Sequence, residues 1–265
     1  MVASSRRVHR VSFLVISVLL FVASVVFTVI WGTAMSAMGG MPMPGGWTMS
    51  MAWMQMPGQT WTMTAVSFVG MWTVMMVAMM LPSLIPMLRR YRKIVWSVAS
   101  ARLGWLTVCV GAGYFFVWIL FGVAAFPLGV ALAEVEMRQP ALARAVPIAA
   151  AIALLLAGAF QFSTWKAHHL ACCRYESAPV PPLRGDPGSA WGYGVRLGVH
   201  CSSCCGNLIV TLLVIGVMDL RAMAIVTVAI TAERLAPAGE RVARAIGAVC
   251  AAAGVVLLAR AAGLV

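Results

Sequence analysis

Charged side chains are scarce in this sequence, and acidic ones are the scarcest. Only 10% of the 265 residues are charged and 7 are Asp or Glu, while 62% are hydrophobic. A soluble globular domain has about 25% charged and about 45–50% apolar residues. Because a soluble fold could not bury this much apolar surface, the composition favours a membrane protein.

The motifs of pumps and of common enzyme classes are also absent. The sequence has no Walker A motif, no phosphorylatable Asp motif and no Gly-rich phosphate loop. Nucleophile elbows and pairs of inward carboxylates are missing as well. Active pumping by this chain alone, hydrolysis, phosphotransfer and dinucleotide chemistry therefore find no support. Whether the chain is an enzyme stays open, with the balance against it.

Long apolar stretches predict an all-α, polytopic transmembrane helical bundle. A helix needs about 20 mainly apolar residues to cross the hydrocarbon core. Seven stretches can be marked, at 11–31, 64–88, 103–127, 145–165, 191–217, 221–234 and 242–264. The sixth is short, so we expect about seven spans, with six as the alternative. The first stretch is too long for the core of a signal peptide.

We expect residues 1–265 to form a single integral membrane domain. It would consist of an N-terminal span at 1–31, an external Met-rich loop at 32–63 and the remaining spans and loops at 64–264. Gly, Pro, Met, Trp and Thr dominate the loop, which shows neither helical nor strand periodicity. We therefore expect irregular structure there.

The basic residues predict the orientation in the membrane. A net charge of +12 could indicate nucleic acid in a soluble protein, but in a membrane protein it marks cytoplasmic loops. Lys and Arg gather at the N-terminus and after the second, fourth and sixth stretches, which share one side if there are seven spans. This predicts a cytoplasmic N-terminus in a bacterial inner membrane and no nucleic-acid partner. Lys166 and Arg234 count among these loop charges, and we expect Glu233 to pair with Arg234 or Arg241.

The sharpest motif lies within the fifth stretch and contains His200, Cys201, Cys204 and Cys205. On a helix these four side chains fall within an arc of about 140°. Thiolate and imidazole are ligands for soft metals such as Cu(I) and Zn. The alternatives are that the cysteines pack as small hydrophobic groups, or that Cys201 and Cys204 form a redox-active CxxC.

Methionine is concentrated in one part of the chain. Fifteen of the 19 methionines lie between Met35 and Met87. In the second stretch Met75, Met76, Met79 and Met80 form two neighbouring stripes, at depths near that of the cysteine motif. Thioethers select Cu(I), although methionine stripes also fill helical cores. The Met-rich loop could capture Cu(I), form a promiscuous contact surface or have no role.

A second group of ligand-type residues follows the fourth stretch and comprises His168, His169, Cys172 and Cys173. Reducing conditions on the cytoplasmic side keep thiols free. These residues could receive or release the same metal ion. Alternatively, the cysteines are palmitoylated or simply buried.

Several blocks together resemble the "domain of unknown function 2182" family, over most of residues 64–250. The blocks are Met75 to Ser83, Phe160-Gln161 with Lys166, Cys173-Arg174, His200 to Gly206 and Glu233 to Gly239. That family is described as predicted metal-binding integral membrane proteins. The resemblance therefore implies a metal-binding membrane protein and supplies no mechanism.

Three functions remain to be compared. The first is a protein that captures, transfers or delivers a soft metal, Cu(I) before zinc or another ion. The second is a membrane thiol-disulfide oxidoreductase, and the third is a non-catalytic subunit of a larger membrane complex. The expected partners are the lipid bilayer and the metal ion, with another membrane protein or a second copy as further candidates.

Overall fold

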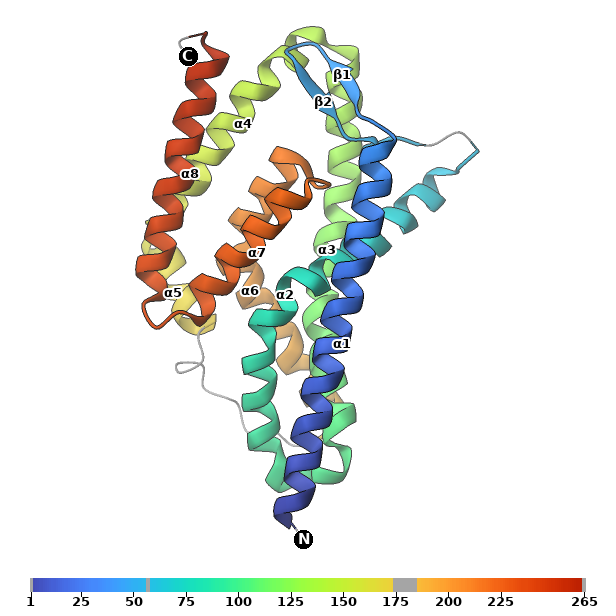
Figure 1. Cartoon of the computed structure of the whole chain (residues 1–265), viewed down its shortest axis with the longest axis vertical. Helices are drawn as coiled ribbons and strands as arrows, with labels where there is room; N and C mark the ends of the chain where they lie inside the picture. Colours follow the sequence, from blue (N-terminus) through green and yellow to red (C-terminus); the bar gives the residue numbers. More distant parts are fainter. Residues whose placement is uncertain (1, 56–57, 174–184, 264–265) are drawn as a thin grey trace.

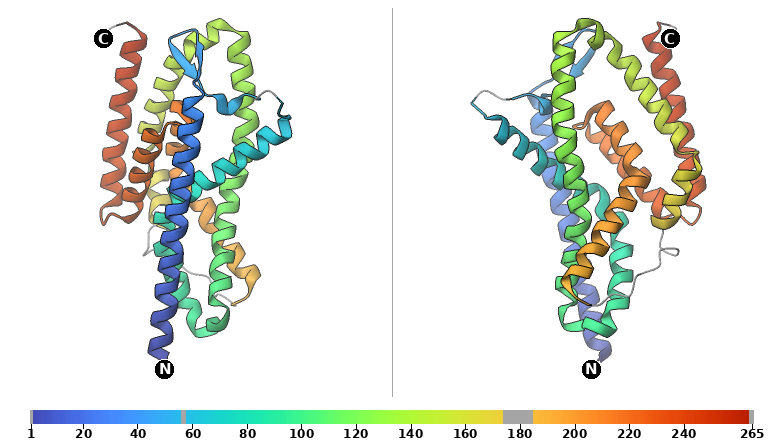
Figure 2. Two further views of the ribbon diagram at one scale, coloured as in Figure 1. Left: turned by 45° about the vertical axis from the view of Figure 1, so that its right-hand side comes forward. Right: turned by 180° about the vertical axis from the view of Figure 1, so that it is seen from behind.

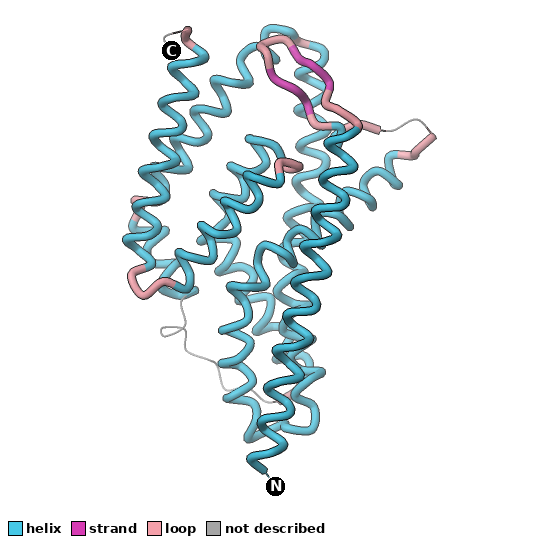
Figure 3. The backbone as a smooth tube through the Cα atoms, viewed as in Figure 1, coloured by secondary structure: helices cyan, strands magenta, loops and turns pink. Residues whose placement is uncertain are grey.

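A computed structural model describes residues 2–55, 58–173 and 185–263, and the side chains of all of these except 2–7, 97–100 and 172–173. The described part is a bundle of long helices with one short β-hairpin (Figure 1, Figure 3). The helices are α1 (Val2–Ala37), α2 (Trp61–Ala99), α3 (Leu103–Arg138), α4 (Pro140–Phe160), α5 (Thr164–Cys173), α6 (Pro187–Gly216), α7 (Leu220–Leu235) and α8 (Gly239–Ala261).

The prediction of an all-α, polytopic helical bundle is confirmed. Among the described residues, α1, α2, α3, α4, α6 and α8 are long and apolar enough to cross a membrane, which makes this an integral membrane protein. With 16 residues, α7 is shorter than the length a full crossing needs. The helix lengths therefore agree with six spans. An even number of spans alone would place both termini on the same side. Because the shorter α7 also runs back between α6 and α8, the two termini lie at opposite ends of the molecule (Figure 1).

The segment 32–63 is more ordered than its sequence predicts. Helix α1 continues to Ala37 and α2 begins at Trp61. Between them, β1 (Met41–Met43) pairs antiparallel with β2 (Trp47–Met49), and a short 3-10 helix, η1, spans Met51–Trp53. Gly45 and Gly46 close the hairpin with φ angles of +107° and +76°, which glycine adopts without steric penalty. The expectation of irregular structure throughout this segment was therefore wrong.

The helices also extend beyond most of the apolar stretches. Helix α3 continues to Arg138, past the predicted end at residue 127, and the stretch 145–165 is divided between α4 and α5. Hydropathy reports the hydrocarbon-facing part of a helix, while the helix itself ends only where its hydrogen bonds stop. Another short 3-10 helix, η2 (Ser100–Arg102), connects α2 to α3.

Helix α2 is the centre of the bundle. Of its most apolar window, 61% is buried inside the protein, against 17% in α1, α3 and α8. The Trp72 indole nitrogen donates to the Trp118 carbonyl oxygen at 2.8 Å and fixes α2 against α3. Pro82 and Pro86 lie inside α2, whose path bends between its two ends (Figure 1). Proline removes an intrahelical hydrogen bond and is the usual cause of such a bend.

Glycines allow two pairs of helices to approach closely. In α3 and α6, a Cβ on Gly194 would lie 2.1 Å from the Val110 carbonyl oxygen. Helices α4 and α8 run side by side along one edge of the molecule (Figure 2), where a Cβ on Gly158 would lie 2.8 Å from the Gly247 carbonyl oxygen. Small residues at such crossings are typical of membrane helix packing, because helices in lipid associate through close contact.

A methyl group at Gly194 should therefore separate α3 from α6. We expect Gly194→Ala to lower the free energy of unfolding by about 1–3 kcal/mol, the usual cost of overpacking. Gly192→Ala is the matched control on the same helix, because a Cβ there has nothing within 4 Å. Thermal unfolding in detergent measures both changes. Equal midpoints for the two variants would contradict this account of the α3–α6 contact.

Candidate metal centre

Helix α6 brings three thiols together in the protein interior. The sulfur atoms of Cys201, Cys204 and Cys205 all lie within 4.8 Å of one another, and none of the three residues is exposed. The Sγ atoms of Cys204 and Cys205 are 3.2 Å apart. The i, i+3 and i, i+4 spacing from Cys201 places these side chains on one helical face. Three soft ligands in a dry site suit a soft metal ion.

The structure does not bring His200 into this cluster. Among the described residues, the group whose ligand atoms converge contains only the three cysteines. His200 is half-buried, and its ring centroid lies 6.1 Å from that of His169. At 100° per residue, the three cysteines lie within an arc of about 100°, and His200 lies about 40° beyond its Cys204 edge. An arc of 140° is too wide for all four side chains to reach one point.

Two polar groups from other helices contact the Cys201 sulfur. The Tyr114 hydroxyl of α3 donates to this Sγ at 3.0 Å, and the Arg234 Nη1 of α7 lies 3.2 Å from it. The same Nη1 donates to the Ser83 hydroxyl of α2 at 2.8 Å. A guanidinium in this place would compensate the negative charge of a thiolate, the form that binds metals. Helices α3 and α7 thus contact this sulfur directly, and α2 is joined to it through Arg234.

A buried ion pair supports the other side of the cluster. The Lys166 ammonium of α5 donates to a Glu233 carboxylate oxygen at 2.8 Å and also to the Cys204 carbonyl oxygen. Gln161 donates to the second carboxylate oxygen at 2.8 Å. Lys166 and Glu233 are 1% and 0% exposed. The predictions for these two residues were wrong: Lys166 is no loop charge, and Glu233 pairs with Lys166.

Arg234 also departs from its prediction, since it is a buried side chain at the thiol cluster and does not act as a surface loop charge. An ionisable side chain inside an apolar segment is costly to bury, so it requires a partner. Glu233 and Arg234 at the end of an apolar stretch already gave this signal in the sequence. Their partners lie 67 and 33 residues away, and no sequence spacing identifies them.

The predicted methionines of α2 are buried in the same core as the thiols. Met75, Met76, Met79 and Met80 are all at most 2% exposed and belong to one cluster with the three cysteines. Ser83, one turn beyond Met79 and Met80, shares the Arg234 guanidinium with Cys201. This places the end of the methionine stripes next to the thiol cluster.

The comparison with protein families agrees with these features. A family model described as "PpoB2: Copper chaperone" matches residues 69–257. The chain belongs to this copper chaperone family. The searches of curated proteins and of solved structures found no match. The match supports the expectation of a metal-related family and specifies copper. It does not support membership of the "domain of unknown function 2182" family by name.

In this member of the copper chaperone family, the histidines after α4 lie beside the thiol helix. The His169 ring centroid is 5.5 Å from that of His168, 4.3 Å from that of Trp165 and 6.1 Å from that of His200. Helix α5 therefore presents imidazoles along α6, next to the cysteine cluster. The predicted Cys172 and Cys173 close α5, but their side chains lie outside the described residues.

Neutralising Glu233 should leave a buried ammonium without its counter-charge. We expect Glu233→Gln to lower the free energy of unfolding by about 3–5 kcal/mol, the usual effect of breaking a buried ion pair. Adding Lys166→Met in the same chain should restore most of that loss. Thermal and denaturant unfolding in detergent give both values.

The Glu134–Arg138 pair of α3 offers a control, because both side chains are largely exposed. Glu134→Gln there should change the free energy of unfolding by less than about 1 kcal/mol. If Glu233→Gln were as mild as this control, the buried pair would not hold the site together.

Proposed function

We propose that this chain is a membrane-embedded Cu(I) chaperone that holds its cargo at Cys201, Cys204 and Cys205. The observation that carries the proposal is three wholly buried thiols within 4.8 Å, in a chain of a copper chaperone family. Thiolate sulfur is a ligand that selects Cu(I). A structural zinc site needs four ligands in tetrahedral geometry, and this cluster supplies three.

The charges around the cluster would balance Cu(I) bound by two of the three sulfurs as thiolates. When ionised, Lys166, Glu233 and Arg234 add up to one net positive charge next to the sulfurs. Cu(I) held by two thiolates, with the third cysteine kept as a neutral thiol, contributes one net negative charge, so the loaded site would be neutral. Neutrality matters here because an uncompensated charge in a low-dielectric interior is costly.

We further propose that the surrounding soft ligands pass copper to and from the thiols. On the side towards α2, copper would be exchanged with the methionines Met75, Met76, Met79 and Met80. On the side towards α5, it would be exchanged with His200, His168, His169, Cys172 and Cys173. With a cytoplasmic N-terminus in a bacterial inner membrane, the histidine side would face the cytoplasm. A chaperone of this kind would hand copper to another membrane protein.

Complete burial argues against a thiol-disulfide oxidoreductase. Such an enzyme exchanges disulfides through a mixed disulfide with a partner thiol, which requires access to the sulfur. The three cysteines are 0% exposed. Cys204 and Cys205, whose sulfurs are 3.2 Å apart, are also adjacent in sequence, a geometry that strains a disulfide. A non-catalytic subunit of a larger complex would tolerate replacement of all three cysteines.

Removing the thiols should remove the bound copper. After anaerobic Cu(I) loading in detergent, we expect the Cys201→Ser/Cys204→Ser/Cys205→Ser variant to hold one copper equivalent less than the wild type, measured by mass spectrometry of metal content. Cys109→Ser/Cys250→Ser is the matched control, because these described cysteines lie outside the cluster. Equal copper in all three proteins would overturn the thiol site.

A further inference from the structure

A second group of sulfur atoms surrounds a cavity of about 200 Å³ at some distance from the thiols. The cavity lies between the C-terminal end of α1, the segment around η1 and the first turns of α2, towards the end of the molecule opposite the N-terminus (Figure 1). It is lined by Trp31, Met35, Met38, Met51, Ala52, Met54, Gln59, Thr64, Ser67, Phe68, Met71 and Met218.

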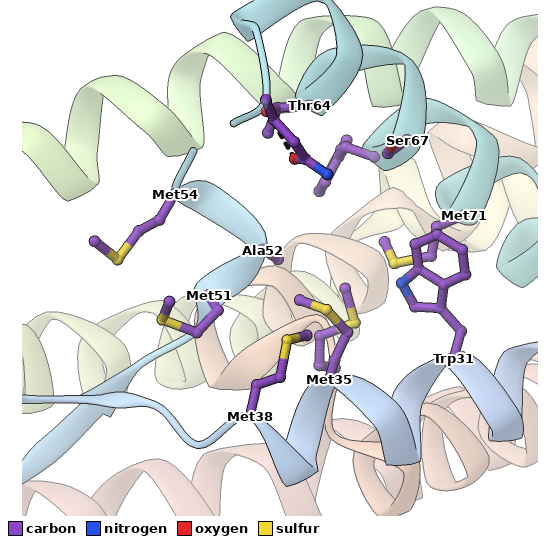
Figure 4. Close-up of a pocket in the computed structure, with 12 residues that line it drawn as sticks. Trp31, Met35, Met38, Met51, Ala52, Met54, Thr64, Ser67 and Met71 are labelled. Atoms are coloured by element: carbon purple, nitrogen blue, oxygen red, sulfur yellow. Dashed lines mark hydrogen bonds between the residues drawn. The ribbon is translucent and has the colours of Figure 1, made fainter. Parts of the chain in front are cut away.

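Half of these twelve lining residues are methionines, and they come from four separate parts of the chain. In the close-up, the side chains of Met35 and Met38 from α1 and of Met71 from α2 point into a common space (Figure 4). Met218 reaches the cavity from the turn between α6 and α7. The fold therefore gathers thioethers that the sequence spreads over more than 180 residues.

Ordinary packing does not account for this arrangement. Methionine is useful in cores because it is flexible enough to fill irregular gaps. Here six methionines surround a space that remains open, and Met38 is 49% exposed. None of the twelve lining residues has a side chain that titrates. The site thus offers neutral, soft sulfur ligands and an indole, which can also stabilise a cation.

We propose that this cavity is a second Cu(I) site, built from thioethers, through which the cargo enters the protein. This inference rests on the proposed function only for the identity of the cargo. Most of the lining residues precede residue 69, so the cavity lies largely outside the range that the copper chaperone model matches. It is a feature of this chain in addition to the matched family core.

Helix α2 supplies the connection between the two sites. Met71 lines the cavity, and Met75 and Met79 follow it at i+4 and i+8, on the same face of the helix. All three are buried. From Met71 to Ser83 the helix rises about 18 Å, and Ser83 shares the Arg234 guanidinium with Cys201. Thioethers therefore recur at each turn between the entry cavity and the thiol cluster.

The two sites differ in how protons take part. A thiol must lose its proton to bind a metal, whereas a thioether carries none. We therefore expect Cu(I) affinity at the cavity to stay constant between about pH 5.5 and 8. Affinity at the thiol cluster should fall as the pH is lowered, because protons then compete with the metal for sulfur.

The experiment uses full-length protein in the Cys201→Ser/Cys204→Ser/Cys205→Ser background, so that the cavity is observed without the thiol cluster. Cu(I) is titrated anaerobically against a chromophoric chelator, and X-ray absorption reports the ligands. The test variant adds Met35→Leu/Met38→Leu/Met218→Leu, which keeps the apolar volume nearly constant. The control adds Met41→Leu/Met63→Leu/Met137→Leu, at exposed methionines that do not line the cavity.

We expect the background protein and the control to bind one Cu(I) in a sulfur environment, and the test variant to bind at least about tenfold more weakly, equivalent to about 1.4 kcal/mol. Loading of the thiol cluster in the test variant with its cysteines restored verifies that the fold is intact. Equal affinity of the test variant and the control would overturn the entry site, as would a background protein that binds no copper.

The two proposals fail in different ways. If the cysteine variant lost all copper, the thiol site would stand and the cavity site would be rejected. If the cysteine variant bound as much copper as the wild type, and the added leucines removed it, the cavity site would stand and the thiol site would be rejected.

Discussion

The structure around the thiols depends on the burial of charge in an apolar interior. Glu233 and Arg234 are adjacent on α7, yet they act on different partners: Glu233 holds Lys166 of α5, and Arg234 holds Cys201 of α6 and Ser83 of α2. A charge without a partner would be very costly at this depth. Four helices are therefore held in one arrangement around the cysteines, by contacts that tolerate little displacement.

This requirement also explains why a short helix matters in a bundle of long ones. Helix α7 has 16 residues and does not match the other helices in length. It carries the charged pair to the level of the thiols, and its turn from α6 places Met218 at the methionine cavity. The same short element thus contributes to both sulfur sites. A longer α7 would displace the charged pair from the thiols or Met218 from the cavity.

The protein uses two kinds of sulfur in two environments. The thiols lie at the centre, wholly buried and in contact with charged and hydroxyl groups. The thioethers line a more open cavity near one end, where no side chain titrates. Thioethers resist the oxidation that converts exposed thiols to disulfides, so this distribution would suit the orientation predicted from the basic residues, in which the cavity end faces an oxidising exterior.

The fold class and the central group of candidate ligands could be predicted from the sequence alone. The apolar runs predicted a polytopic helical bundle, because crossing hydrocarbon imposes a minimum length of apolar helix. The Cys201, Cys204 and Cys205 spacing predicted one helical face of soft ligands, because the helical period is fixed. The resemblance added a metal-related membrane family, and the copper chaperone match agrees with that expectation.

Only the tertiary structure decided which distant groups meet. The pairing of Lys166 with Glu233, the contact of Tyr114 and Arg234 with Cys201, and the separation of His200 from the thiols depend on how helices from different parts of the chain pack. The cavity around Met35, Met71 and Met218 has the same origin. Local periodicity says which side of a helix a residue occupies, but the neighbour on that side is chosen by close packing and by the need to neutralise buried charge.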